Sequence, residues 1–297
     1  MGLLEPGVLL DEYKILRLAN VGGMCLLYEA QPVAEPQSVA IKALYDLWAN
    51  DAEIRNRFLN EAHVLKMLEH PHIVSAYGAG ALPSGEPYIA LEWLPYSLQG
   101  VLDARKSGID IPLVVRLSRQ LVEALVFLHE QNIVHRDIKA SNVLLDTDDL
   151  TRARARLADL GLAKVAPERR SASGMQVSTN GQARFGTWDY MAPEQWIRSK
   201  EVDTKTDVYS LGVLMFQMIS GGLPFVANDA KNLMRMHLFV EAPMELLRGK
   251  CPRLLSTLVE RMLRKKAKER PNMKEVLEKL GMISGKSGMK EQVNGCE

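Results

Sequence analysis

The chain has 297 residues, of which 47% are hydrophobic and 25% charged, and its formal net charge is +1. These values are typical of a globular protein and exclude a collagen, a coiled-coil rod and a largely disordered chain. The balance of charge gives no indication of binding to nucleic acid or to an acidic membrane surface. The cysteines, Cys25, Cys251 and Cys296, are far apart, which favours a reducing compartment over a disulfide framework or a zinc cluster.

The sequence contains no segment with the pattern of a secretory signal or of a membrane-spanning helix. Residues 1–11 lack a basic stretch followed by an apolar one. The most apolar run, residues 208–219, is too short to cross a bilayer and is interrupted by Ser210 and Gln217. We therefore expect residues 208–219 to form a buried helix, and we expect a cytoplasmic protein with no direct insertion into a membrane.

Strands dominate the elements predicted for the N-terminal third of the chain. Residues 13–45 have the pattern of short strands separated by Gly and Pro, and residues 39–44 form the clearest of them. A helix is predicted over residues 51–69, because its apolar residues fall on one face and Asp51 can cap its N-terminus. Residues 88–94 then predict another apolar strand.

Helices dominate the rest of the sequence. Their patterns predict helices over residues 113–130, 207–220, 254–263 and 273–280, followed by a flexible tail rich in Gly, Ser and Lys over residues 283–297. The change from strands to helices falls near residues 94–98. This segregation indicates an α+β fold with two lobes.

Two charged residues occupy positions that the pattern predicts to be buried. Lys42 lies in the apolar strand over residues 39–44, and Glu61 shares the apolar face of the helix predicted over residues 51–69. An unpaired buried charge costs several kcal/mol or so, and each residue is the natural partner of the other. Without further context, this pair could be purely structural.

A dense group of polar residues lies between two apolar segments at residues 135–142, His-Arg-Asp-Ile-Lys-Ala-Ser-Asn. The aspartate can accept a proton, the lysine can bind a phosphate oxygen, and the asparagine can bind a hard metal ion through its carbonyl oxygen. Further on, Asp159 comes at the end of an apolar stretch and before Leu160 and Gly161. This position suits a magnesium ligand, although Asp-x-Gly is also a common turn.

In their order and spacing these segments, together with Ala192-Pro193-Glu194, resemble the motifs of the protein kinase family over residues 13–280. The pattern is most similar to that of bacterial serine/threonine kinases of the eukaryotic type. The resemblance implies a bilobal fold with an N-lobe over about residues 13–93, a hinge at about 92–97 and a C-lobe over about 98–280.

The resemblance also implies catalytic roles. Asp137 would orient the substrate hydroxyl and accept its proton, and Lys139 would neutralise phosphate charge. Asn142 and Asp159 would bind Mg²⁺. Lys139 and Thr187 are both typical of kinases that act on serine or threonine rather than tyrosine.

The implied ATP site includes a degenerate Gly-rich loop. In residues 20–25 only the middle glycine of the GxGxxG pattern, Gly22, is retained, which predicts weakened ATP binding. Cys25 at the third glycine position could be a redox-sensitive thiol, but we favour a small residue that fills the glycine position. The full set expected to bind ATP is Asn20, Val21, Gly22, Gly23, Met24, Cys25, Leu27, Ala40, Lys42, Glu61, Leu91, Glu92 and Leu94.

Three structural or regulatory contacts are also implied. Glu194 would pair with Arg270, and Asp207 would anchor the loop over residues 135–142. The segment before Thr187 is polar, and we hypothesise that Ser178 or Thr179 is a phosphorylation switch whose added charge pairs with Arg136.

We therefore expect a serine/threonine protein kinase that uses ATP and Mg²⁺, acts on protein substrates and autophosphorylates its activation loop, for which a dimer is one route. A pseudokinase that acts as a scaffold is the main alternative, and the degenerate Gly-rich loop favours it. The intact set of Lys42, Glu61, Asp137, Asn142 and Asp159 favours the active kinase. A small-molecule kinase of related fold is a further alternative, which Thr187 and Ala192-Pro193-Glu194 oppose.

Overall fold

The computed structural model of the chain describes residues 3–160, 188–197 and 202–291, with side chains described up to residue 284 of the last helix. The chain divides into two compact units. The N-terminal unit comprises Met1–Pro95 and Leu160–Val165, and the C-terminal unit comprises Tyr96–Asp159 and Ala166–Glu297. The boundary after Pro95 falls inside the change from strands to helices that the sequence predicts.

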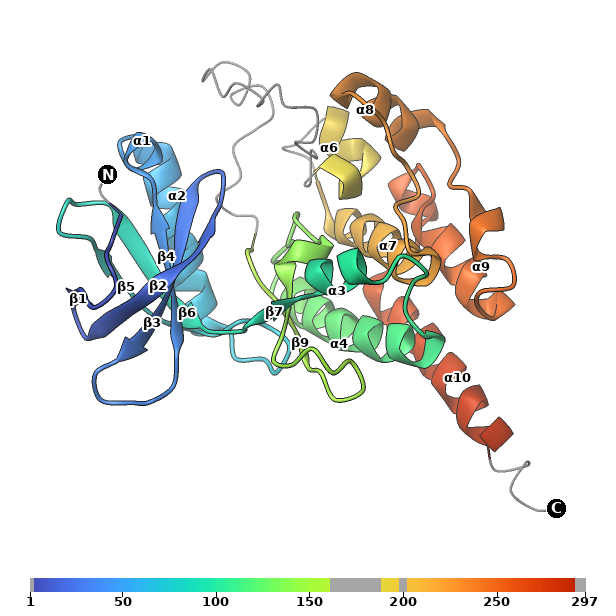
Figure 1. Cartoon of the computed structure of the whole chain (residues 1–297). Coiled ribbons are helices and arrows are strands. Elements are labelled where there is room, and N and C mark those ends of the chain that lie inside the picture. Colours follow the sequence, from blue (N-terminus) through green and yellow to red (C-terminus); the bar gives the residue numbers. More distant parts are fainter. Residues whose placement is uncertain (1–2, 161–187, 198–201, 292–297) are drawn as a thin grey trace. The chain divides into compact units, whose positions relative to one another are not determined.

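The N-terminal unit is built on an antiparallel sheet with the strand order β1-β2-β3-β4-β6-β5 (Figure 1). The strands are β1 (Leu9–Leu10), β2 (Tyr13–Val21), β3 (Cys25–Pro32), β4 (Val39–Leu44), β5 (Ala76–Ala81) and β6 (Pro87–Glu92). Side chains of β3 alternate between buried and partly buried positions, which is the period of two expected for a sheet with one covered face. The fully buried Ile15, Tyr28 and Ile41 lie in the core of this unit.

Two helices follow β4, namely α1 (Asp46–Ala49) and α2 (Ala52–Met67). Asp51 caps α2 as predicted, because its carboxylate accepts hydrogen bonds from the backbone N–H groups of Glu53 (2.9 Å) and Ile54 (3.2 Å). The helix ends at Met67 rather than at residue 69, because the backbone of Leu68 is already extended. The predicted apolar face is buried and includes Glu61.

The C-terminal unit is mainly helical, as predicted. Its helices are α3 (Leu98–Ala104), α4 (Ile111–Glu130), α6 (Pro193–Ile197), α7 (Thr204–Ser220), α8 (Ala230–Phe239), α9 (Arg253–Met262) and α10 (Met273–Glu291). A small antiparallel sheet joins β7 (Tyr96–Ser97), β8 (Val143–Leu145) and β9 (Ala155–Leu157). Every residue of α7 from Thr206 to Ile219 is buried, which confirms the predicted core helix.

The last helix differs from the prediction. The sequence predicts a helix over residues 273–280 and a flexible tail from residue 283, but α10 continues to Glu291. The buried side chains of Leu280 and Ile283 show the physical reason, since packing continues past the predicted helix end. The small and charged residues that follow extend this helix. Residues 292–297 lie outside the described part of the chain.

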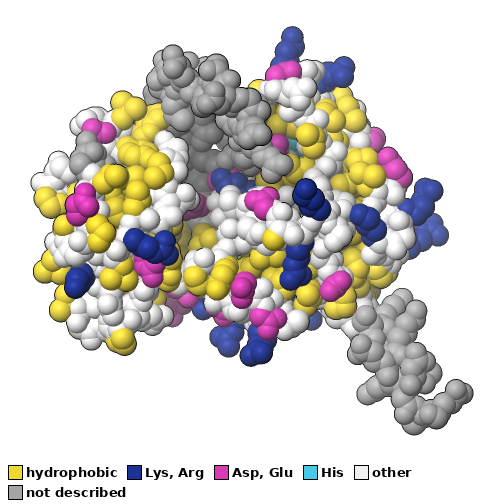
Figure 2. Space-filling model, viewed as in Figure 1, with side chains coloured by type: hydrophobic (Ala, Val, Ile, Leu, Met, Phe, Trp, Pro, Cys, Tyr) yellow, Lys and Arg dark blue, Asp and Glu magenta, His cyan; other side chains and the backbone are white. Residues whose placement is uncertain are grey.

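Lys and Arg side chains lie among Asp and Glu on the visible face of the C-terminal unit (Figure 2), in agreement with the near-zero net charge. Among the described residues, the helices are all too short or too polar to cross a membrane.

Candidate active site

The predicted pair of Lys42 and Glu61 forms within the N-terminal unit. The Nζ atom of Lys42, on β4, lies 3.1 Å from Oε1 of Glu61, on α2. Their side chains are 15% and 3% exposed, and the Lys42 ammonium also lies 5.8 Å from the centroid of the Phe58 ring. Because the pair is largely shielded from water, its geometry fixes the position of the ammonium group.

One face of the sheet gathers four of the residues expected to bind ATP. Leu27 is the cross-strand partner of Lys42, and Ala40 is the partner of Leu91. Directly opposed residues project to the same face, as do residues two apart on one strand such as Ala40 and Lys42. The register of β3, β4 and β6 therefore brings these four side chains onto one face. Leu94, just beyond β6, is buried as well.

The Gly-rich segment forms the connection between β2 and β3. The N–H group of Gly22 donates to the carbonyl oxygen of Cys25 at 2.9 Å, and that of Val21 donates to Oδ1 of Asn20 at 2.8 Å. A Cβ atom at position 22 would lie 3.1 Å from the Cys25 carbonyl oxygen, so a side chain at this position would require a small shift of the backbone. Cys25 pairs with Leu44 at the start of β3 and is partly buried.

In the C-terminal unit, Asp207 anchors the loop over residues 135–142, as predicted. Its fully buried carboxylate accepts hydrogen bonds from the backbone N–H groups of His135 (2.9 Å) and Arg136 (2.8 Å). The Nε2 atom of His129, on α4, lies 2.8 Å from the same carboxylate. Arg136 has a φ of 66°, which is rare for a residue with a side chain. The two backbone bonds to Asp207 hold this strained turn in place.

This loop brings Asp137, Lys139 and Asn142 together. The Nζ atom of Lys139 lies 3.1 Å from Oδ2 of Asp137, whose side chain is 9% exposed. The side-chain amide of Asn142 donates to the carbonyl oxygen of Asp137 at 2.9 Å. Because the amide nitrogen is used in this bond, the Asn142 oxygen is oriented elsewhere and can act as an acceptor or a metal ligand.

Asp159 is connected to the same loop through its neighbour. The N–H group of Ala158 donates to the carbonyl oxygen of Asn142 at 2.8 Å, and the Nε2 atom of His135 lies 3.1 Å from the Ala158 carbonyl oxygen. Asp159 itself has a φ of 59°, in the left-handed region that aspartate tolerates better than most residues. The chain thus turns sharply at the predicted metal ligand.

The donor atoms of this region fit a magnesium ion. Asn142 and Asp159 supply an amide oxygen and a carboxylate, which are hard ligands, and Mg²⁺ usually takes one or two carboxylates plus water and phosphate oxygens. No group of three or more His, Cys, Asp or Glu residues in the described part of the chain is arranged to hold a metal by itself. A magnesium ion held by Asn142 and Asp159 would take its remaining ligands from water and phosphate oxygens.

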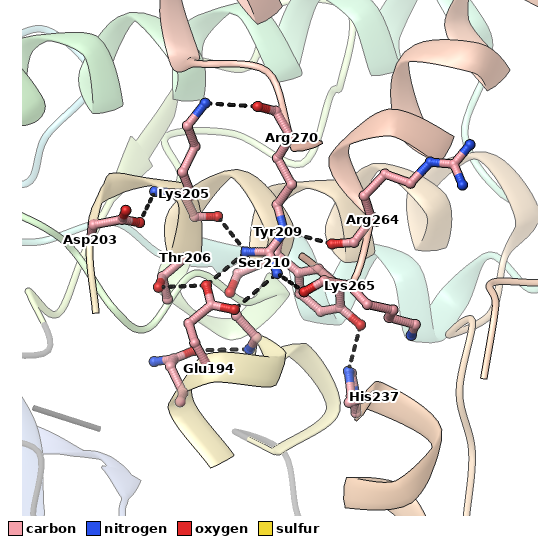
Figure 3. A network of polar contacts seen from close by, with 12 residues as sticks. Glu194, Asp203, Lys205, Thr206, Tyr209, Ser210, His237, Arg264, Lys265 and Arg270 are labelled. Atoms are coloured by element: carbon pink, nitrogen blue, oxygen red, sulfur yellow. Dashed lines mark hydrogen bonds and ion pairs between the residues drawn. The ribbon is translucent and has the colours of Figure 1, made fainter. Parts of the chain in front are cut away.

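The predicted ion pair of Glu194 and Arg270 is the centre of a larger network (Figure 3). The guanidinium group of Arg270 donates to both carboxylate oxygens of Glu194, at 2.7 and 2.9 Å. It also donates to three backbone carbonyl oxygens, those of Lys205, Arg264 and Lys265. Burial by itself raises the pKa of Glu194, but the hydrogen bonds and charge of Arg270 outweigh it and hold that pKa below its usual value.

Sequence reasoning missed the role of Gln195, which follows the predicted Ala192-Pro193-Glu194 segment. Its Nε2 atom donates to the carbonyl oxygen of Arg136 at 3.1 Å, and its Oε1 atom accepts from the N–H group of Ala192 at 2.9 Å. Gln195, on α6, therefore connects the loop over residues 135–142 to the N-terminal end of that helix. No local pattern signals the contact with Arg136, because the two residues are 59 positions apart.

Three predicted residues lie outside the described part of the chain. They are the catalytic candidate Thr187 and the phosphorylation candidates Ser178 and Thr179.

Most of the chain is similar to proteins of one family. Residues 13–280 match the protein kinase domain. Serine/threonine-protein kinase pkn2 of Myxococcus xanthus is 34% identical over 273 residues, which cover 89% of this chain and 31% of that protein. Serine/threonine-protein kinase PrkC of Bacillus subtilis is 31% identical over 231 residues, which cover 78% of this chain and 34% of that protein. This chain thus spans about a third of the length of these two relatives.

Solved structures show the same fold. The kinase domain of PknI from Mycobacterium tuberculosis superposes with a TM-score of 0.67 at 23% sequence identity, covering 94% of this chain and 99% of that one. The matched residues 13–280 include the Lys42–Glu61 pair, the anchored loop of Asp137 and the Glu194–Arg270 pair, so the chain belongs to the protein kinase family.

Proposed function

We propose that the protein is a serine/threonine protein kinase that transfers the γ-phosphoryl group of ATP to protein hydroxyl groups. The observation that carries this proposal is the loop in which Asp137, Lys139 and Asn142 lie together while Asp207 holds the backbone. Phosphoryl transfer mainly requires that the substrate hydroxyl is positioned and that the charge of the phosphate is neutralised. The fixed carboxylate of Asp137 beside the fixed ammonium group of Lys139 meets both requirements. The names of the relatives and the presence of Lys139 support serine and threonine as acceptors.

In this mechanism Asp137 accepts the proton of the substrate hydroxyl as its oxygen attacks the γ-phosphorus, and ADP leaves. Lys139 neutralises charge on the transferred group, and Lys42, oriented by Glu61, binds the α- and β-phosphates. A magnesium ion bound to Asn142 and Asp159 would supply further neutralisation of the phosphate charge.

Two other contacts belong to the same proposal. The backbone of Glu92 and Leu94 would bind the adenine edge, while Leu91 would border the adenine pocket. Autophosphorylation of Ser178 or Thr179 would regulate the enzyme, with a dimer as a route for transfer between copies.

Intact mass spectrometry of the purified protein, before and after incubation with ATP and MgCl₂, tests this proposal. We expect additions of phosphate in the wild type and in Asp148→Ala, a matched control at an exposed aspartate, but none in Asp159→Ala. Peptide mapping of the product then tests Ser178 and Thr179. A wild type that binds no ATP and gains no phosphate would favour a scaffold without catalytic activity.

A further inference from the structure

Three consecutive carbonyl groups of the Gly-rich segment are bound by one short stretch of chain, Tyr45 to Trp48. The hydroxyl group of Tyr45 donates to the carbonyl oxygen of Gly22 at 3.1 Å. The indole N–H group of Trp48 donates to the carbonyl oxygen of Gly23 at 3.3 Å, and the backbone N–H group of Tyr45 donates to that of Met24 at 3.0 Å. Tyr45, at the N-terminus of α1, and Trp48, within α1, therefore hold this connection through two side chains and one backbone group.

These bonds determine the direction of the neighbouring N–H groups. A trans peptide is planar, so its N–H bond points opposite to its C=O bond, and none of the described peptide bonds is cis. The carbonyl of Gly22 shares its peptide plane with the N–H group of Gly23, and the carbonyl of Gly23 shares its plane with the N–H group of Met24. When the two carbonyls point toward Tyr45 and Trp48, both N–H groups point away from them.

We propose that Tyr45 and Trp48 are positioning residues that orient the Gly23 and Met24 amides toward the polyphosphate of a bound nucleoside triphosphate. Successive N–H groups aimed to one side form a concave donor site for anions. This inference rests on the proposed kinase function and adds residues that lie outside the Gly-rich motif.

The amino-acid composition of the segment makes such support necessary. Two adjacent glycines leave the backbone free to sample many conformations, and ordering them costs more entropy than ordering other residues. Tyr45 and Trp48 reduce this freedom before the nucleotide arrives, which is the general benefit of preorganisation. Trp48 is buried and thus rigidly held, and the phenol of Tyr45 is protonated at neutral pH, so both groups act as hydrogen-bond donors.

Nucleotide binding by two variants tests the proposal. Tyr45→Phe removes one donor and keeps the ring, and Trp48→Phe removes the other. The readouts are the Kd for ATP and for adenosine, which lacks phosphates, and the KM and kcat for ATP. For Tyr45→Phe we expect a Kd and KM for ATP that rise about threefold to tenfold, as the loss of one hydrogen bond predicts, with adenosine binding and kcat unchanged.

Tyr88→Phe is the matched control, because it removes a hydroxyl hydrogen bond, that to Asp11, elsewhere in the N-terminal unit. We expect the control to bind ATP as the wild type does. A Tyr45→Phe protein with an unchanged Kd for ATP, or one that loses ATP and adenosine affinity equally, would overturn the positioning role. A wild type that binds neither ligand would instead contradict the proposed kinase function, so the two failures are distinguishable.

Discussion

Replacement of Arg270 by methionine should destabilise the C-terminal unit far more than any exposed ion pair does. The Arg270 side chain is completely buried, and its guanidinium group donates five hydrogen bonds, two to Glu194 and three to backbone carbonyls. Methionine keeps much of the volume and removes all five donors. Glu194, whose side chain is 22% exposed, would keep the Thr206 hydroxyl, at 3.0 Å, as its one side-chain donor among the described residues.

Removing one partner of a buried ion pair costs about 3–5 kcal/mol of unfolding free energy. At about 2–4 °C per kcal/mol for a domain of this size, the expected decrease in Tm is about 6–20 °C. Arg264→Met is the matched control, since the Arg264 side chain points away from the network in Figure 3 and pairs with Glu260 at 3.0 Å on the surface. Such exposed pairs contribute less than about 1 kcal/mol, so this Tm should change by less than about 4 °C.

Differential scanning calorimetry at several pH values distinguishes the loss of the ion pair from a loss of packing alone. In the wild type the pKa of Glu194 is held below its usual value, so its contribution to stability is present above that value and is lost as pH falls through the folded pKa. In Arg270→Met, burial without the guanidinium raises that pKa, and protonation in acid relieves the unpaired charge. The Tm difference should therefore narrow as pH falls. Equal losses for Arg270→Met and Arg264→Met, or a difference that does not depend on pH, would refute this reasoning.

Three further predictions concern two substitutions and one titration. Asp207→Asn replaces the carboxylate that accepts from the Arg136 N–H group with an amide, which accepts hydrogen bonds through one oxygen instead of two. The value of kcat should fall about tenfold or more, while the circular dichroism spectrum stays unchanged. Gly221→Ala should lower Tm strongly in thermal denaturation, because φ is 88° and the new Cβ would lie 2.1 Å from the Lys106 carbonyl oxygen, and an unchanged Tm would contradict this clash. Burial lowers the pKa of His237 to about 3, so the NMR signals of its ring should not titrate between pH 8 and 5. In the unfolded chain the same imidazole takes up a proton near its ordinary pKa of about 6.5. The free energy of unfolding should therefore decrease as pH drops below about 6.5.

Much of the local structure follows from the sequence alone. The strand over residues 39–44, the helix cap at Asp51 and the buried helix near residues 208–219 are each determined by periodicity or by a capping residue, and all three are present. The pairing of Lys42 with Glu61 is predictable as well, because two charges on apolar faces need a partner. These features are predictable because periodicity and capping depend on residues within one element, and because a buried charge needs a partner of opposite charge.

The extent of the last helix could not be read from its sequence. Its final residues are rich in Gly, Ser and Lys and predict a tail, yet α10 continues to Glu291. Intrinsic propensity is weak compared with burial, and the packing of Ile283 is a property of the neighbouring elements rather than of the segment.

The family motifs, the order of the strands and helices, and the charged residues of the candidate site could all be predicted from the sequence. Beyond the contacts that the family motifs imply, the structure was needed to identify further distant groups that hold the site. His129 and Asp207 are 78 residues apart, and Trp48 and Gly23 are 25 apart, yet each pair is hydrogen-bonded. Hydrogen bonds of this kind depend on where separate elements pack, and neither periodicity nor local propensity contains that information.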